Sequence, residues 1–186
     1  MNLLTIIIIA VAVVVLWVIV AFNGLVARRM RVREALSDID VQLKRRYDLI
    51  PNLIEAVKGY MQHERDVLEN VTRARAMIGG GNPLERDATE NALSGTLKTL
   101  FAVAENYPDL KADKRFSELH DELIDTEDKV QAARRFHNST ARDMNTALET
   151  FPSSIIARAF SFKPEPFFAV ENEEERAAIK VDFSSP

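Results

Sequence analysis

The amino-acid sequence predicts an all-α protein, with a single N-terminal transmembrane helix followed by an antiparallel up-and-down bundle of three to four long helices. Two observations carry this prediction. An uncharged apolar run lies near the N-terminus, and amphipathic stripes with apolar residues three and four positions apart follow it along the chain. Such stripes must be buried on one another, and the rest of a 186-residue chain is enough for one ordinary domain.

The apolar run covers residues 3–21, and fourteen of its nineteen residues are Leu, Ile or Val. At ~1.5 Å per residue it forms a helix of roughly 28 Å, close to the ~30 Å hydrocarbon core of a bilayer. A cleaved signal peptide is the main alternative. The run is longer than the apolar region of a signal peptide, has no Lys or Arg before it and has no small-residue cleavage site after it. We therefore expect a retained transmembrane anchor over residues 1–23.

The residues after the run set the expected orientation. Arg28, Arg29, Arg31 and Arg33 follow it directly, and the positive-inside rule places them in the cytoplasm. We therefore expect a single-pass protein of the cell (inner) membrane, with the N-terminus outside and the bundle in the cytoplasm. The same four arginines are candidate contacts for anionic lipid headgroups, at about 1 kcal/mol each near the surface. The alternative is that they only enforce the topology.

The first amphipathic stripe extends over residues 24–78 and contains Pro51. A proline inside a helix lacks an N–H and clashes one turn back, so it breaks or kinks the helix. Because Leu43, Ile50 and Val57 keep the stripe in phase across Pro51, we expect a kink near Pro51 and no reversal of the chain there, with Asp48 as the candidate cap of a restarted helix. The glycines at 79–81 then end the element.

Two further helices are expected over residues 83–107 and 113–151, and the bundle as a whole over 24–160. Asn82 and Pro83 are suited to the N-cap and first residue of the former. The longest stripe lies in the latter and includes Leu119, Leu123, Thr126, Val130, His137, Thr140 and Met144. Its charged residues, Glu127 and Arg134 among them, suggest a solvated face with local ion pairs. Pro152 stops this helix, and Ser153 is the candidate cap of a short helix that ends at Ala159.

Arg46 lies where the first stripe requires an apolar residue. Two interpretations remain open. Arg46 is buried and paired with a carboxylate of a neighbouring helix, which fixes the register at some cost in stability, or its guanidinium reaches out to solvent past its own stem. The surrounding residues form a candidate register or interaction segment: Arg45, Arg46, Tyr47, Asp48 and Pro51.

The C-terminal residues 161–186 are predicted to form a Phe-rich extended tail that packs on the bundle. Four phenylalanines are its candidate contacts: Phe160, Phe162, Phe167 and Phe168. One interpretation is that the tail folds back and plugs the open end of its own bundle, and the other is that these side chains form a binding patch.

Recognisable catalytic equipment is absent from the sequence. Zero cysteines exclude disulfides, Cys-ligated zinc, iron–sulfur clusters and thiol nucleophiles, and the net charge of −4 gives no support to a nucleic-acid partner. His63 lacks the second histidine of a metalloprotease helix, His120 lacks the Glu-x-x-His spacing of di-iron bundles, and His137 lies on a core stripe. We therefore predict no enzyme, no cofactor and no catalytic, cofactor-binding or metal residues.

The chain resembles the LemA family over essentially its whole length. The similarity lies in the run Asp-Ile-Asp-Val-Gln-Leu-Lys-Arg-Arg-Tyr-Asp-Leu-Ile-Pro-Asn-Leu (38–53) and in Val57–Tyr60, His63–Glu64, Arg73-Ala-Arg75, residues 104–112, Thr126–Glu127, Phe151-Pro-Ser, Phe160 and Phe162. It departs where family members tend to show a Tyr-Asn pair twice, because this chain has His137-Asn138 and Met144-Asn145. Since His137 and Met144 lie on the predicted stripe, we expect these changes to repack the core and leave the fold intact.

The resemblance implies a single-pass membrane protein with a helical bundle, associated with envelope functions and membrane protease systems. It implies no established reaction and no functional residues to transfer. We expect an envelope-associated adaptor or scaffold that acts through protein or lipid contacts. The alternative is a self-assembling structural or membrane-organising protein, although one clear apolar seam per helix does not indicate a homo-oligomer. The apolar span is expected to continue into the first bundle helix with no flexible linker between them.

Overall fold

The computed structural model describes residues 2–168, and the regular structure in this range is entirely helical, which confirms the predicted all-α class. Most of the predicted tail, residues 169–186, lies outside the described residues, as does residue 1. The described helices are α1 (Leu3–Lys58), α2 (Arg65–Ala76), α3 (Asp87–Ala104), α4 (Pro108–Lys111), α5 (Lys114–Glu149) and α6 (Ser153–Ala159).

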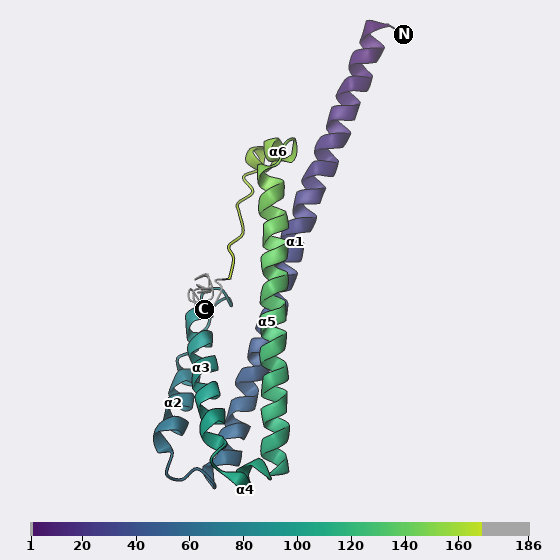
Figure 1. Cartoon of the computed structure of the whole chain (residues 1–186). Coiled ribbons are helices and arrows are strands. Elements are labelled where there is room, and N and C mark those ends of the chain that lie inside the picture. The colour runs from purple at the N-terminus through teal and green to yellow at the C-terminus, as the bar shows by residue number, and fades with distance from the viewer. Residues whose placement is uncertain (1, 169–186) are drawn as a thin grey trace, which may run out of the picture.

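The long helices alternate in direction, as expected for an up-and-down bundle (Figure 1). α1 and α5 lie side by side, and α2 and α3 pack against the half of this pair that is distant from the N-terminus. The other half is narrow, and the short α6 lies across its end beside α1. The bundle therefore has a four-helix part far from the apolar run and a two-helix part next to it.

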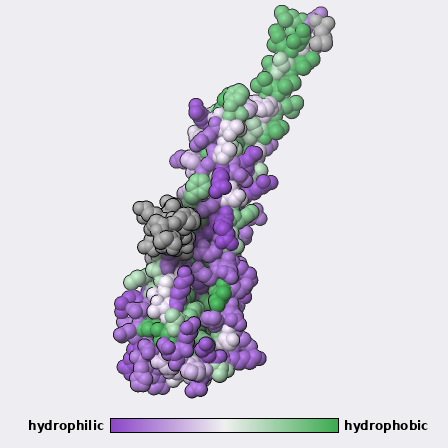
Figure 2. Space-filling model, in the orientation of Figure 1, coloured by the Kyte–Doolittle hydropathy of each residue, from purple (hydrophilic) through white to green (hydrophobic). Residues whose placement is uncertain are grey.

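A single 56-residue helix, α1, carries the chain from the apolar run into the bundle. Its N-terminal part is long and apolar enough to cross a membrane, and no residue of its most apolar window is buried. Figure 2 shows this part protruding as an apolar rod from a mostly polar bundle. The expectation that the span continues into the first bundle helix without a linker is confirmed.

The expected helix over 24–78 is in fact two helices. α1 ends at Lys58, a turn follows, and α2 begins at Arg65 and runs back along the bundle. The turn places Met61 in the core together with Val71 and Leu93. The apolar stripe of α2 is therefore buried in the same core as that of α1, although the two helices run in opposite directions. Pro51 lies inside α1 and the chain does not reverse there.

Asp48 does not cap a restarted helix. It lies within α1 and forms an ion pair with Lys44, one turn earlier, at 2.8 Å. The helix is continuous on both sides of this carboxylate, so no orphan N–H groups are present there for it to accept.

Asn82 caps the turn that leads into α3. Its Oδ1 accepts from the backbone N–H of Leu84 at 2.9 Å and of Glu85 at 3.2 Å, and Glu85 accepts in return from the N–H of Asn82 at 3.3 Å. Gly81 precedes it with a φ of +127°, a conformation that glycine tolerates best. Asp113 similarly caps α5 by accepting from the N–H of Phe116 at 3.1 Å.

Among the residues that the structure describes, the core consists of three apolar clusters along the bundle. The largest fills the four-helix part and includes Leu53, Leu93 and Leu119. A smaller cluster around Ile39 and Val130 lies in the two-helix part, and the third joins α6 to α1 at the end next to the apolar run. Polar side chains lie among these clusters, and they form the first candidate site.

Candidate functional site

Arg46 is the central residue of a buried polar network. Only 1% of its surface is exposed, and its guanidinium lies among side chains of α3 and α5. Nη1 donates to Glu127 Oε2 at 2.6 Å and to Ser94 Oγ at 2.7 Å, while Nη2 forms an ion pair with the equally buried Glu90. Of the two interpretations left open by the sequence, the structure has the paired and buried arginine.

Further polar contacts link the same three helices. Arg86 on the α3 side pairs with Asp40 of α1, and Arg134 of α5 pairs with Asp87 of α3 at 2.8 Å. Arg134 is buried and Glu127 is partly buried, so the interpretation of these two residues as part of a solvated face was wrong. Sequence reasoning missed Glu90 altogether, because its neighbours Asp87, Thr89 and Asn91 are also polar and nothing in this stretch marks one carboxylate as buried.

The charge of Arg46 sets the protonation of its neighbour. Burial by itself raises the pKa of the Glu127 carboxyl. The positive charge of Arg46 and hydrogen bonds from Gln131, Arg46 and Ser94 outweigh that effect, so the pKa lies below its ordinary value. Glu127 is therefore a carboxylate at neutral pH and serves as a counter-ion for Arg46. A group held in this state is suited to fixing helix register.

The rest of the segment from Arg45 to Pro51 is occupied by contacts within the chain. Arg45 Nη2 pairs with Glu122 of α5 at 2.7 Å, on an exposed face. The Cζ atom of Arg75, in α2, lies 3.9 Å from the centre of the Tyr47 ring. This segment therefore holds α1 against α2, α3 and α5, while Asp48 and Pro51 remain exposed.

Two asparagines of α5 hold the extended chain that follows α6. Asn145 accepts from the N–H of Glu165 at 2.8 Å and donates to its carbonyl at 2.9 Å. Asn138 makes the same pair of bonds with Phe168, at 2.9 and 3.1 Å. One sign of this arrangement is visible in the sequence, the Asn residues seven positions apart at 138 and 145, but their spacing alone does not show what they bind.

The four tail phenylalanines divide between the two interpretations. Phe168 is buried against Ile39 and Val130 and meets the His137 ring edge to face at 5.1 Å. Phe162 packs on Phe22, with ring centres 5.8 Å apart. Phe160 also contacts Phe22 but remains half exposed, and Phe167 is exposed. The described part of the tail packs along the side of α5, and two of its rings face outward.

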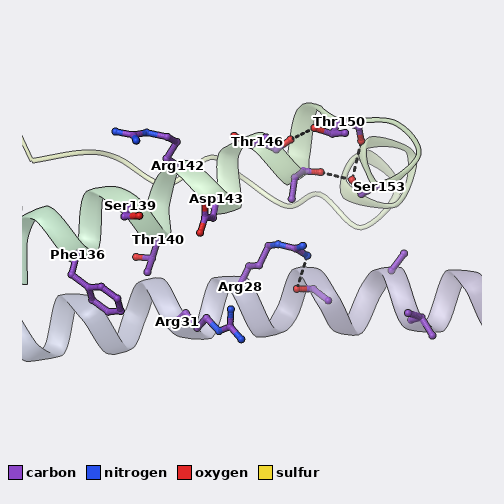
Figure 3. A pocket seen from close by; sticks show the side chains of 14 residues that line it. Arg28, Arg31, Phe136, Ser139, Thr140, Arg142, Asp143, Thr146, Thr150 and Ser153 are labelled. Atoms are coloured by element: carbon purple, nitrogen blue, oxygen red, sulfur yellow. Dashed lines mark hydrogen bonds between the residues drawn. The ribbon is translucent and has the colours of Figure 1, made fainter.

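A groove of about 980 Å³ separates α1 from α5 at the end next to the apolar run. Arg28 and Arg31 line it from α1, and Asp143, Thr146 and Thr150 line it from α5. In Figure 3, Arg28 and Asp143 point into the space between the two helices. The remaining arginines of the predicted headgroup set lie elsewhere.

Arg29 and Arg33 do not line this groove. The guanidinium carbon of Arg29 lies 5.2 Å from the centre of the Phe162 ring, so Arg29 helps to hold the tail. Arg33 is exposed on α1. The four arginines after the span are thus split between groove, tail and open surface.

Within residues 2–168, no cluster of three His, Cys, Asp or Glu side chains is arranged to hold a metal ion. A small cavity of about 140 Å³ borders Arg46, Ser94 and Glu127. These three residues are already paired with each other. What these polar residues do in the structure is hold α1, α3 and α5 in one register.

Fold and site together define a class: a helical bundle with a buried ion-pair network, built on a helix that begins as a candidate membrane span. The family model of the LemA family matches residues 35–183, and the chain belongs to this family. It is 27% identical to Protein LemA of Metamycoplasma hominis over 167 residues, which cover 87% of this chain and 74% of that protein.

The chain is also similar to magnetosome proteins. It is 20% identical to Magnetosome protein MamQ of Magnetospirillum gryphiswaldense over 174 residues and to Magnetosome protein MamQ 2 of Paramagnetospirillum magneticum over 176 residues. Each match covers 79% of this chain and 64% of the relative. With the apolar part of α1, these findings support a membrane-associated protein of the LemA type.

Proposed function

We propose that this protein is a membrane-tethered scaffold or adaptor of the cell envelope, and that it acts through protein or lipid contacts and not through catalysis. The observation that carries the proposal is the unbroken α1, which passes from the candidate span into the buried network around Arg46. A bundle joined to the membrane in this way is held in one pose. Partners that meet it at a fixed height and angle lose less freedom on binding than partners of a loosely tethered domain.

The proposed orientation places the N-terminus outside and the bundle in the cytoplasm of the inner membrane. It rests on the arginines that follow the span, Arg28, Arg29, Arg31 and Arg33. Because the chain has no cysteine, a single Ser117→Cys variant tests it. We expect a membrane-impermeant maleimide to label this variant only after the inner membrane is opened. Labelling of intact spheroplasts would instead indicate the opposite orientation, with the bundle outside.

The proposed partners are membrane or envelope proteins, with membrane protease systems as the class that family resemblance suggests. Photo-crosslinking in cells tests this, with probes at the exposed apolar positions Val41 on α1 and Phe136 on α5, and at Met77, which follows α2, as the matched position. We expect adducts with a different protein at Val41 and Phe136, and fewer such adducts at Met77. Adducts with lipid alone would replace the adaptor by a lipid-surface role, and adducts with further copies of this chain alone would favour self-assembly.

A further inference from the structure

The helix α6 exposes apolar side chains on the face that it does not bury. Ile156 and Ala157 are buried against Leu25 of α1. On the other side, Ile155 is 53% exposed, and the flanking Phe151 and Phe160 are 77% and 54% exposed. Large apolar side chains that are exposed together in this way, at the end of the bundle next to the apolar run, mark a candidate surface for membrane contact.

The contacts of α6 fix its level along the candidate membrane span. Its cluster includes Val18, Ala21 and Leu25 of α1. If the hydrocarbon region ends near Ala21, then Val18 lies about 4.5 Å inside that boundary and Leu25 about 6 Å outside it, at ~1.5 Å rise per residue. α6 therefore lies level with the boundary itself (Figure 1), within the ~5–10 Å range in which interfacial helices bury their apolar face.

We propose that α6 is an interfacial membrane anchor, which inserts Phe151, Ile155 and Phe160 into the bilayer leaflet at the C-terminal end of the span. Phenylalanine and aliphatic side chains are typical of the apolar face that interfacial helices bury in the membrane. Basic residues, which anionic headgroups attract, lie on the bundle side of this boundary: Arg158 on α6, Lys163 just after it, and Arg28 and Arg31 in the neighbouring groove. The chain then touches the membrane at two points, the span and α6, and this fixes its rotation as well as its height.

Continuity with the span makes the bilayer the occupant of this surface. α1 itself holds α6 at the membrane boundary, and Phe22 joins the two by contacting both Phe160 and Phe162. A partner protein or a second copy that covered the same face would have to enter the interfacial region beside α1. The proposal rests on the span lying in a bilayer and does not depend on the scaffold function.

Depth measurement with spin labels tests the proposal on the full chain. Because the chain has no cysteine, single-cysteine variants are made directly, reconstituted in phosphatidylcholine–phosphatidylglycerol vesicles and labelled with a nitroxide. We expect a label at Ile155→Cys to collide more with oxygen than with an aqueous nickel chelate, as expected below the phosphates. Ile124→Cys is the matched control, an isoleucine of α5 that is 47% exposed and far from the span. It should favour the nickel chelate.

Two further labels keep the test decisive. Phe151→Cys repeats the measurement at a position outside α6, so that a disturbance of the short helix does not decide the result. Val11→Cys lies in the middle of the apolar run and reports whether the span is in the bilayer at all. If the label at Val11 lies deep in the bilayer while the labels at Ile155 and Phe151 behave like the label at Ile124, α6 is not an anchor. If the labels at Ile155 and Phe151 are shielded from both oxygen and the nickel chelate, the proposal is overturned in favour of a covering protein.

Discussion

Arg75 donates from Nε to the carbonyl oxygen of Tyr47 at 3.4 Å, and the helical partner of that carbonyl is missing because residue 51 is proline. In a regular helix, the N–H four residues later would bind this oxygen. Pro51 has no N–H to give, so a side chain of α2 takes its place while its guanidinium stacks on the Tyr47 ring. The contact shows how α1 continues through Pro51 and why α2 docks there.

Replacing Arg75 by methionine should therefore cost more stability with Pro51 present than without it. We expect Arg75→Met to lower the free energy of unfolding by about 1–3 kcal/mol, because the carbonyl and the ring both lose their partner. In a Pro51→Ala background, the restored N–H binds the Tyr47 carbonyl and the cost should shrink. Urea unfolding of the four proteins of this double-mutant cycle in detergent measures the difference.

The control for this cycle is Arg73→Met, in the same helix. Arg73 pairs with Glu69 one turn away on an exposed surface, so we expect little change in either background. An Arg75→Met cost that is the same with and without Pro51 would contradict the role assigned to the carbonyl and leave only the ring contact.

Asn138 should act as a clamp on the tail. Asn138→Ala removes both hydrogen bonds to the Phe168 backbone at a partly buried site, where we expect a cost of about 1 kcal/mol. We expect amide hydrogen exchange in the segment 163–168 to rise severalfold, as measured by mass spectrometry. The exposed Asn70→Ala in α2 is the matched substitution, and an equal rise in both variants would show that the clamp is not specific.

The network around Arg46 should be intolerant of losing this central cation. Arg46→Ala and Arg46→Met both remove the counter-charge of Glu127 and leave Glu90 with only the Nε of Arg86, at 4.0 Å, and breaking a buried ion pair costs about 3–5 kcal/mol. Adding Glu90→Gln and Glu127→Gln to Arg46→Met should restore much of this loss. Thermal unfolding of the full chain measures it.

The neighbouring Arg45→Met serves as the control for the Arg46 variants, because Arg45 makes its ion pair on the surface. We expect it to leave the melting temperature nearly unchanged. If Arg46→Met were equally neutral, the three charges would have no coupled role in holding the helices together.

The fold class, the unbroken first helix and the unusual Arg46 were predictable, because each depends on which residues recur at helical spacing. The end of α1 at Lys58 was not. A stripe that is buried in a continuous helix and one that is buried in a folded-back helix have the same period, and Gly59 alone does not distinguish them. The partners of Arg46 were also hidden, because Glu90 and Glu127 are two carboxylates among many until the helices are placed side by side.

The contacts of the tail were unpredictable for a different reason. Asn138 and Asn145 bind backbone atoms of Phe168 and Glu165. Because every residue type has these backbone atoms, the amino-acid sequence does not indicate which residues the asparagines bind. The sequence showed that the pairs His137-Asn138 and Met144-Asn145 are seven residues apart. The apolar stripe already placed His137 and Met144 on the core face, which the structure confirms, and only the structure shows that Asn138 and Asn145 hold the extended chain.

The buried His137 should make the stability of this protein depend on pH. Burial lowers the pKa of its imidazole from the ordinary value of about 6.5, against smaller opposing effects of Asn138 and Glu165. As the pH falls through 6.5, the unfolded chain takes up a proton that the folded chain does not, so the folded state loses stability until the pH reaches the lower folded pKa. This contribution is fully present above about pH 7.

We therefore expect the free energy of unfolding to decrease between pH 7 and pH 5, and we expect His137→Phe to decrease less over the same interval. Phenylalanine keeps an aromatic ring against Phe168 and has no proton to exchange. Glu127 does not produce the same effect. Because its pKa is lowered in the folded state, its contribution to the stability of the protein is lost only as the pH falls below the ordinary pKa of a glutamate, which is more acidic than this interval. Urea unfolding of both proteins at the two pH values gives the comparison, and parallel decreases would mean that groups other than His137 cause the pH dependence.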